Sequence, residues 1–317
     1  MRPADVGRAV DVLRGGGLVA FPTETVYGLG ADASSVAAVR RLFAVKRRPP
    51  DHPVIVHLGD PALLPEWAAR VPGAAAVLAG ACWPGPLTVV VRRAARVPDA
   101  VTGGRDTVGL RVPDHPVALA LLRAFDGGVA APSANRFGRV SPTTAADVRA
   151  DLGGDVDLVL DGGPCRVGIE STIVDCTGPR PAILREGGVP RRRVEALLGT
   201  TVPLRTRGEI AAPGTLASHY APRARVELTD RAEIDERARA ALARGERVGV
   251  IGAPPVDGRA VGLGEPADAE RYAHELYAML RAADAHELDV VLAVAPTGAG
   301  LAAAVADRLQ RAAGGAA

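Results

Sequence analysis

One short turn gathers the groups best suited to binding phosphate. The chain has 317 residues and 38 basic side chains, and Lys46 is its only lysine. Residues 46–53 place Lys46, Arg47, Arg48 and His52 together among three prolines. A lysine kept where arginine is used everywhere else favours a site that needs a compact ammonium. The turn is therefore a candidate for holding phosphate oxygens, and a solvated basic loop is the equal alternative.

A second candidate is the segment Phe21–Gly30, which follows a short apolar run. It carries the hydroxyls of Thr23 and Thr25 with a carboxylate and a phenol, on what we expect to be a loop closing on paired glycines. A plain turn does not need so many polar groups. The glycines also match a degenerate dinucleotide fingerprint, which we discount because five polar or bulky residues separate them from the strand.

Two ionisable residues stand at or near the ends of aliphatic strands. Arg111 lies within Thr107–Pro113, and a charge among aliphatic residues needs a partner. It is either a member of a structural ion pair or a clamp for a substrate carboxylate. His57 ends another predicted strand, at the edge of an α/β sheet where ligands bind, and we interpret it as functional.

Other polar groups also follow predicted strands. They occur in Ala131–Ser141, in Glu170–Asp175 and at Arg185, which precedes a glycine pair two residues on. No group of residues has the spacing of metal ligands, and no Gly-x-Ser-x-Gly nucleophile turn is present. A site rich in Arg, Lys, Thr and Ser suits phosphoryl or nucleotidyl transfer, where positioning and charge neutralisation supply most of the catalysis.

Short β-type runs alternate with alanine- and leucine-rich helical patterns, which predicts an α/β fold with a twisted, open, mixed sheet flanked by helices. The predicted strands are 18–21, 54–57, 87–91, 108–112, 129–131, 158–160, 172–174 and 182–184, and the predicted helices are 6–14, 35–45, 61–70, 74–81, 117–125, 144–151 and 189–198.

A second alternation begins after a proline-containing stretch. Its predicted strands are 226–228, 248–251 and 290–293, and its helices are 232–244, 267–283 and 301–312. We therefore predict a catalytic domain over 1–200, a linker or lid over 201–222, and a smaller Rossmann-like α/β domain over 223–317.

Composition narrows the class of protein. The net charge is +2, too balanced for bulk nucleic-acid binding, and residues 223–317 carry −3 against +5 for the remainder. The N-terminal part is thus the better candidate for handling anions.

Three scattered cysteines suit neither a disulfide framework nor a zinc site. Without a signal-peptide pattern or a long apolar run, we expect a soluble, cytoplasmic protein with no membrane contact.

Taken in order, these segments resemble the two-domain YrdC-type L-threonylcarbamoyladenylate synthases. The resemblance rests on Pro22–Gly30, Lys46-x-Arg48-Pro49, Ser133-Ala134-Asn135, Glu170–Asp175 and Leu184-Arg185, with Ser218–Pro222 resembling the family's linker. It implies that L-threonine, bicarbonate and ATP give threonylcarbamoyl-AMP and pyrophosphate. A downstream tRNA threonylcarbamoyl-transferase complex then modifies an adenosine next to the tRNA anticodon. It also leaves room for a weak contact with tRNA itself.

The resemblance also implies roles for individual residues. Lys46 and Arg48 would be catalytic, and Mg²⁺ would be held mainly through phosphates. The implied threonine site comprises Thr25, His57, Arg111, Ala131 and Ser171, and the implied ATP site comprises Lys46, Arg48, His52, Thr107, Ser133, Asn135, Ser141, Arg185, His219 and Tyr220.

The chain departs from the family pattern at a few positions. Ala131 replaces a Ser or Thr, which leaves only its backbone for the substrate, and Glu186 replaces a frequent proline. Two other classes stay open: a double-stranded RNA or tRNA-binding module without catalysis, and a carbamoyltransferase-type maturation factor. The buried-looking Arg111 and the hydroxyl-rich loop with Thr23 and Thr25 both favour small-molecule catalysis. The maturation factors carry a zinc segment that three scattered cysteines do not supply.

Overall fold

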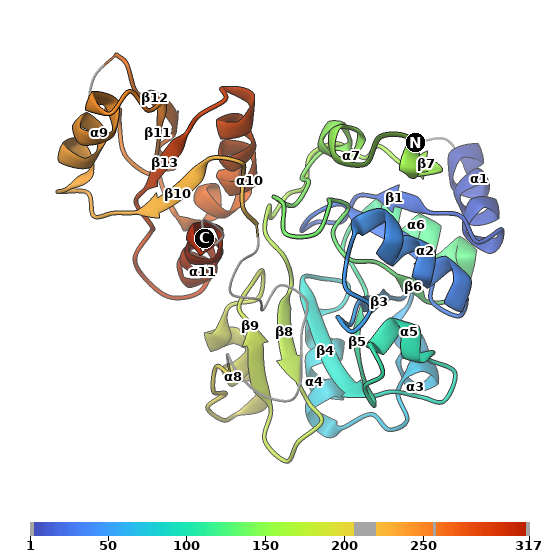
Figure 1. Ribbon diagram of the computed structural model, residues 1–317. Coiled ribbons are helices and arrows are strands. Elements are labelled where there is room, and N and C mark those ends of the chain that lie inside the picture. Colours follow the sequence, from blue (N-terminus) through green and yellow to red (C-terminus); the bar gives the residue numbers. More distant parts are fainter. Residues whose placement is uncertain (1–2, 206–219, 256–257, 315–317) are drawn as a thin grey trace. The chain divides into compact units, whose positions relative to one another are not determined.

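The chain forms two compact units of mixed α/β structure (Figure 1). The structure is a computed structural model that describes residues 3–205, 220–255 and 258–314. The first unit comprises Met1–Phe137, Pro142–Arg166 and Glu170–Thr215, and the second comprises Gly138–Ser141, Val167–Ile169 and Leu216–Ala317. The second unit therefore includes two short stretches that precede residue 170, in addition to its C-terminal segment.

The first unit is built on a nine-stranded mixed sheet with the strand order β7-β1-β2-β6-β3-β5-β4-β8-β9. Its strands are β1 (Val19–Phe21), β2 (Gly28–Asp32), β3 (Ile55–His57), β4 (Leu87–Arg92), β5 (Thr107–Arg111), β6 (Val129–Ala130), β7 (Leu158–Val159), β8 (Thr172–Asp175) and β9 (Ala182–Arg185). Its helices are α1 (Pro3–Arg14), α2 (Val36–Lys46), α3 (Leu64–Trp67), α4 (Gly73–Cys82), α5 (Asp99–Thr102), α6 (Pro116–Phe125), α7 (Ala145–Leu152) and α8 (Arg191–Leu198), with 3₁₀ turns η1 (Pro61–Leu63) and η2 (Gly153–Asp155).

The prediction of a loop through Gly28 and Gly30 is wrong, because β2 begins at Gly28 and pairs antiparallel with β1. The glycines permit this close pairing. A Cβ on Gly30 would lie 2.9 Å from Phe21 Cε1 and 2.9 Å from Val129 Cγ1. The polar loop therefore spans only Pro22–Tyr27. The helix predicted over 61–70 is also shorter, because α3 ends at Trp67 and Ala68 forms a β-bridge with Arg93.

The register of the strands defines the two faces of the sheet. Residues directly opposite each other on neighbouring strands point to the same face. His57 pairs with Arg111 on one side and with Val129 on the other. Val129 packs with Phe21 in the cluster formed with α1 and α6. The face that α1 and α6 cover at β1 and β6 is thus the face that carries His57 and Arg111.

The opposite face of β3, β5 and β4 belongs to the main aliphatic core, which includes Val56, Leu110 and Val89. A separate small cluster contains only strand residues, namely Ile55, Val90, Ile173 and Leu184. Ile55 and Val90 both lie opposite Gly109 and therefore share the face of Arg111. One face of the sheet thus combines polar groups with an apolar surface.

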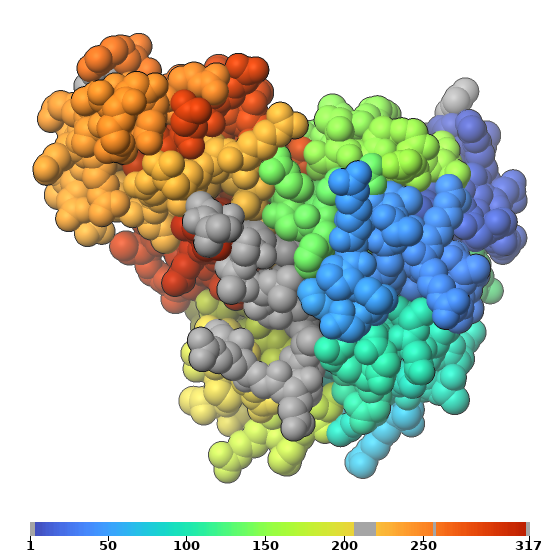
Figure 2. All heavy atoms as spheres, viewed as in Figure 1, coloured from blue at the N-terminus to red at the C-terminus, as the bar shows by residue number. Residues whose placement is uncertain are grey.

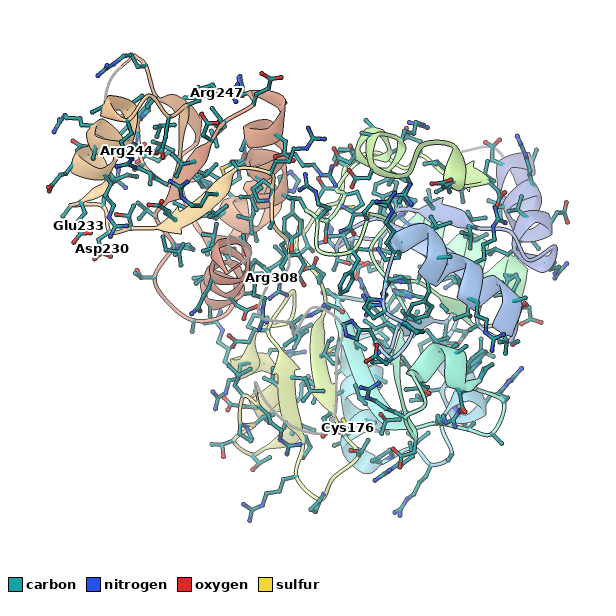
Figure 3. All side chains as sticks on the ribbon, viewed as in Figure 1. Cys176, Asp230, Glu233, Arg244, Arg247 and Arg308 are labelled. Carbon is teal, nitrogen blue, oxygen red and sulfur yellow. The ribbon has the colours of Figure 1, made fainter. Side chains whose placement is uncertain are left out.

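The second unit is a parallel four-stranded sheet with the order β10-β13-β11-β12. Its elements are β10 (Arg225–Leu228), α9 (Ile234–Ala243), β11 (Val248–Ile251), β12 (Val261–Gly264), α10 (Ala269–Ala285), β13 (Val290–Ala293) and α11 (Leu301–Ala313). Ion pairs join the amino ends of three strands, as in the contacts of Arg247 with Glu287 and Asp289; Arg247 is labelled in Figure 3.

Helix α10 holds the stretch Gly138–Ser141 inside the second unit. Asp284 pairs with Arg139 at 2.9 Å, and Arg281 donates to the carbonyl of Val140 at 2.6 Å. The backbone of Ala221 donates to the carbonyl of Gly138 at 3.0 Å. The first stretch of the second unit is therefore fixed by side chains about 140 positions further along the chain.

Most of the predicted linker, residues 206–219, lies outside the described residues. Its beginning is part of the first unit. Ile183 in β9 donates to the carbonyl of Pro203 at 2.9 Å, and Arg205 donates to the carbonyl of Ile183 at 2.8 Å. Residues 203–205 therefore lie along the sheet edge at β9.

Candidate active site

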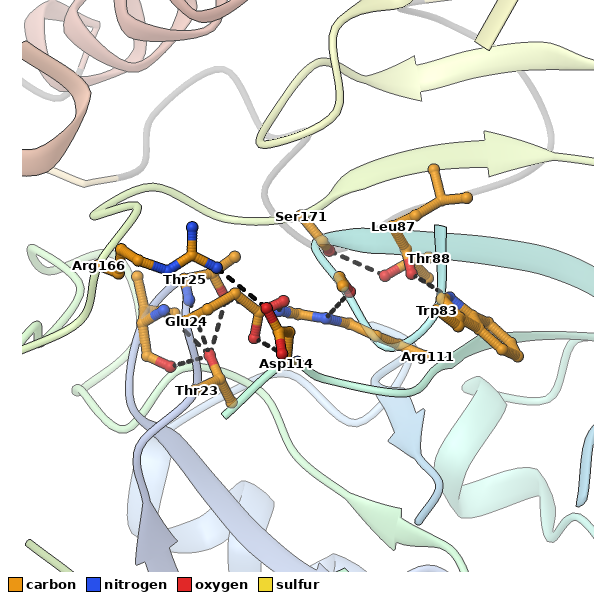
Figure 4. A network of polar contacts seen from close by, with 12 residues as sticks. Thr23, Glu24, Thr25, Trp83, Leu87, Thr88, Arg111, Asp114, Arg166 and Ser171 are labelled. Atoms are coloured by element: carbon orange, nitrogen blue, oxygen red, sulfur yellow. Dashed lines mark hydrogen bonds and ion pairs between the residues drawn. The ribbon is translucent and has the colours of Figure 1, made fainter. Parts of the chain in front are cut away.

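Arg111 lies at the centre of a buried polar network at the end of β5 (Figure 4). Its side chain is 4% exposed. Its Nη2 donates to Glu24 Oε1 at 2.7 Å and to Thr25 Oγ1 at 3.0 Å, and its Nε donates to the carbonyl of Gly85 at 3.2 Å. Arg111 therefore has the carboxylate partner that a buried charge requires. Nη1 makes no hydrogen bond within the described part of the chain, so it is the edge available to a ligand.

The hydroxyl of Thr25 has a defined hydrogen-bond direction. Thr23 Oγ1 lies 2.6 Å from the carbonyl of Val26, which can only accept, so the single hydrogen of Thr23 goes there. The 2.8 Å contact between Thr23 and Thr25 must then use the hydrogen of Thr25. Because Thr25 Oγ1 also accepts from Arg111, it retains one lone pair for a ligand. Thr25 is therefore an acceptor for a ligand N–H or O–H.

His57 contributes a neutral imidazole beside this network. Burial, and secondarily the charge of Arg111, lowers the pKa of His57 to about 3. Its ring meets that of Phe21 edge-on at 6.1 Å, and its Nδ1 is buried without a hydrogen-bond partner among the described residues. Such a group offers a ligand a directed, uncharged contact.

Ser171 reaches the same face from the loop before β8. Its Oγ lies 2.8 Å from Thr88 Oγ1, and the β4–β5 register places Thr88 opposite Arg111. Arg185 donates to the carbonyl of Ser171 at 2.9 Å through Nη2 and at 3.2 Å through Nε. The structure thus brings Thr25, His57, Arg111 and Ser171 to one region, with Arg185 bordering it.

Lys46 is nearly fully buried at the end of α2, with 2% exposure. Its Nζ donates to the carbonyl of Ser133, and to that of Asn135 at 2.5 Å. Burial, followed by the charge of Arg48, lowers the Lys46 pKa well below its usual value. The predicted trio of Lys46, Ser133 and Asn135 is therefore a contiguous cluster, held by backbone carbonyls.

Arg48 follows directly, because Arg47 adopts a left-handed conformation (φ 53) that ends the helix. Arg48 Nη2 donates to the carbonyl of Pro53 at 2.9 Å, and its guanidinium lies 5.5 Å from the ring centre of Phe137. His52 also packs on Phe137, at 5.4 Å between rings. Protein contacts thus hold Arg48 and His52, while Arg47, Pro50 and Asp51 of the same turn are exposed.

The remaining predicted residues are Thr107, Ala131, Ser141, His219 and Tyr220. Thr107 shares the site face, at the opposite end of β5 from Arg111. The Ala131 N–H donates to the carbonyl of Ile55 at 2.9 Å. Ser141 belongs to the second unit. Tyr220 does too, stacked on Tyr277 and under Arg308, and His219 lies outside the described residues.

Sequence reasoning gave no role to four neighbours of the site, although it singled out the segment that carries two of them, Thr23 and Glu24. Glu24 is the partner of Arg111, Thr23 orients Thr25, Thr88 contacts Ser171, and Phe137 supports Arg48. A signal for Thr88 exists, since it is a hydroxyl within an otherwise aliphatic strand, Leu87–Arg92. Phe137 has no comparable signal, because its ring meets a segment about 90 positions earlier.

Within residues 3–205, 220–255 and 258–314, no group of three His, Cys, Asp or Glu could hold a metal ion, and no helix is long and apolar enough to cross a membrane. A cavity of about 860 Å³ lies on the outer side of α2 and α5, which adjoin in blue and teal in Figure 2. Of the predicted site residues it includes only Arg48.

The fold and the site define a two-domain α/β protein of the YrdC type, with a buried arginine and a basic turn on the first domain. Residues 11–187 match the family Sua5/YciO/YrdC, described as telomere recombination, and residues 189–314 match the C-terminal domain of threonylcarbamoyl-AMP synthase. The chain belongs to the Sua5/YciO/YrdC family, with the Sua5-type C-terminal domain.

Individual relatives agree over nearly the whole length. The threonylcarbamoyl-AMP synthase of Pyrococcus abyssi is 41% identical, covering 96% of this chain and 93% of the relative. The enzyme of that name from Bacillus subtilis is 37% identical, covering 98% and 93%. The crystal structure of P. abyssi Sua5 complexed with L-threonine is similar with a TM-score of 0.93 and 39% identity, covering 99% of this chain and 96% of that one.

Proposed function

We propose that this protein is an L-threonylcarbamoyladenylate synthase, which converts L-threonine, bicarbonate and ATP into threonylcarbamoyl-AMP and pyrophosphate. The observation that carries the proposal is the polar network of Arg111, Thr25, His57 and Ser171 on one sheet face, in a chain of this family. The reaction places the protein among the nucleotidyltransferases and among the enzymes of tRNA modification.

The network suits an amino acid. The free Nη1 group of Arg111 can donate a charge-assisted hydrogen bond to a carboxylate. Thr25 can only accept, so its partner is the amine, the carbamate N–H or the hydroxyl of threonine rather than the carboxylate. Neutral His57 adds a contact without competing for charge.

The basic turn suits the triphosphate. Lys46 and Arg48 supply positive charge, and His52, Ser133 and Asn135 surround them. The apolar cluster of Ile55, Val90, Ile173 and Leu184 offers a nucleotide base or ribose a packing surface on the same face. On the first unit, Thr107 and Arg185 are further residues that we propose for ATP binding. Mg²⁺ would accompany the phosphates, since the described residues provide no carboxylate cage for it.

The chemistry needs little more than positioning. Threonine and bicarbonate form a carbamate, and one carbamate oxygen attacks the α-phosphorus of ATP as the bond to pyrophosphate breaks. The carbamate is already an anion, so the protein needs no strong base. It must align two anions and offset the charge that develops on pyrophosphate. The product is a labile mixed anhydride, which a tRNA threonylcarbamoyl-transferase complex would consume; a weak tRNA contact would assist that transfer.

The decisive experiment is pyrophosphate release from ATP, with threonine and bicarbonate omitted in turn. We expect release that requires both, with threonylcarbamoyl-AMP detected by mass spectrometry. Carbon-labelled bicarbonate should enter the product. Release that is independent of threonine, or RNA binding without pyrophosphate release, would overturn the proposal.

A further inference from the structure

Glu24 uses both of its oxygens inside the protein. Its side chain is 1% exposed. Oε1 accepts from Arg111 Nη2 at 2.7 Å, and Oε2 accepts from the backbone N–H of Asp114 at 2.9 Å (Figure 4). Glu24 therefore ties the guanidinium to the chain just beyond β5. With both oxygens engaged, its contribution to a substrate is made through Arg111.

We propose that Glu24 is a positioning residue that sets Arg111 for the threonine carboxylate, an inference that rests on the proposed function. By occupying Nη2 together with Thr25, Glu24 leaves Nη1 as the open edge of the guanidinium. The Gly85 carbonyl occupies Nε in the same way. Three fixed contacts hold the planar group in one orientation before the substrate arrives.

The ion pair also sets the charge of the pocket. A buried arginine without a counter-ion would attract any anion, including a phosphate of ATP. Paired with Glu24, Arg111 presents directed hydrogen bonds in a locally neutral site. The pair thereby favours binding of the threonine carboxylate at Arg111 over binding of an ATP phosphate at the same position.

A glutamine cannot replace Glu24. Both of its protein partners, Arg111 Nη2 and the Asp114 N–H, are donors. The amide has one acceptor oxygen, so its NH₂ group would face a donor on one side or the other. Glu24→Gln should therefore turn or shift the guanidinium while adding almost no volume.

The test compares threonine with threoninol, which lacks the carboxylate. In Glu24→Gln we expect the threonine KM to rise about tenfold or more, with the ATP KM changed much less, since a misplaced contact group costs up to about a hundredfold. The preference for threonine over threoninol, measured as a ratio of kcat/KM values, should shrink by a similar factor. A purely structural role would lower the melting temperature without moving that ratio.

Arg166→Gln is the matched control, because Arg166 pairs with the exposed side chain of Asp114 in the same turn, at 3.0 Å. The threonine KM of Arg166→Gln should stay within about twofold of the wild-type value, as expected for the loss of an exposed ion pair. If Glu24→Gln does not fold, Glu24→Asp keeps the charge but is too short to span both donors, and it should raise the threonine KM selectively. An unchanged preference for threonine in a folded Glu24 variant would overturn the inference. Absence of threonine-dependent pyrophosphate release in the wild type would instead refute the proposed function.

Discussion

The two buried cations of the first unit have opposite surroundings. Arg111 has a buried carboxylate partner, Glu24, at 2.7 Å. Lys46 is held by the carbonyls of Ser133 and Asn135, and Arg48 adds repulsion. A cation already neutralised suits a ligand group with a single charge. A cation held by backbone carbonyls, with other cations nearby, gains far more from a multiply charged ligand. The difference suits a carboxylate at Arg111 and a triphosphate at Lys46.

The substitution Lys46→Ala is the strongest test of the difference between the two cations. If Lys46 stabilises the departing pyrophosphate, the rate of pyrophosphate release should fall by about a hundredfold or more. Folding stability should change little, because a costly buried charge is also removed. Arg40→Ala is the control, since Arg40 is an exposed arginine of the same helix. A folded Lys46→Ala protein with near-normal turnover would refute the assignment.

The substitution Arg111→Lys tests the assignment of Arg111 to the threonine carboxylate. A lysine ammonium cannot hold Glu24, the Gly85 carbonyl and a carboxylate in one plane. We expect the threonine KM to rise about tenfold or more and the ATP KM to change much less, measured by steady-state pyrophosphate release. An unchanged threonine KM would mean that Arg111 is only a structural ion-pair member.

The pKa of Lys46 provides a third test. Because burial and Arg48 lower that pKa in the free protein, an arriving triphosphate should raise it, and ATP binding should take up protons at pH values around and above the free-protein pKa. ATP affinity should then fall by up to about tenfold per pH unit above the free-protein pKa. Calorimetry in two buffers of different ionisation enthalpy measures the uptake. Lys46→Ala should remove it, and equal uptake in both proteins would contradict the idea.

His57 gives the smallest effect, on stability rather than activity. Its pKa falls from 6.5 to about 3 on folding, so the unfolded chain binds a proton more readily than the folded one. Above pH 6.5, His57 is neutral in both the folded and the unfolded chain and does not reduce the free energy of unfolding. As the pH falls from 6.5 toward 3, the unfolded chain is protonated first and the free energy of unfolding decreases. The loss reaches about 1.4 kcal/mol per pH unit. Urea titrations at several pH values should show wild type losing stability relative to His57→Gln on acidification. If the free energies of unfolding of wild type and His57→Gln change with pH in parallel, His57 does not titrate in this way.

The order of most elements in the two units was predictable because each is encoded locally. Aliphatic runs such as 87–91 and 248–251 give strands, and Pro142-Thr143-Thr144 gives a helix start, where the Thr144 side chain and Asp147 form a capping box. The strand β2 was missed, because its glycines indicate a turn when read alone. The tertiary structure shows why β2 needs glycine, because a side chain at Gly30 would collide with Phe21 and Val129.

The sequence by itself determined which residue types are available for chemistry and which strands and helices carry most of them. It could not determine partners. Glu24 and Arg111 are 87 positions apart, and Lys46 and Ser133 are equally distant. Such contacts depend on strand order and register, which arise from the packing of the whole sheet rather than from local pattern. The tertiary structure alone therefore decided that Arg111 is neutralised, that Lys46 is not, and that Thr25 can only accept a hydrogen bond from its ligand.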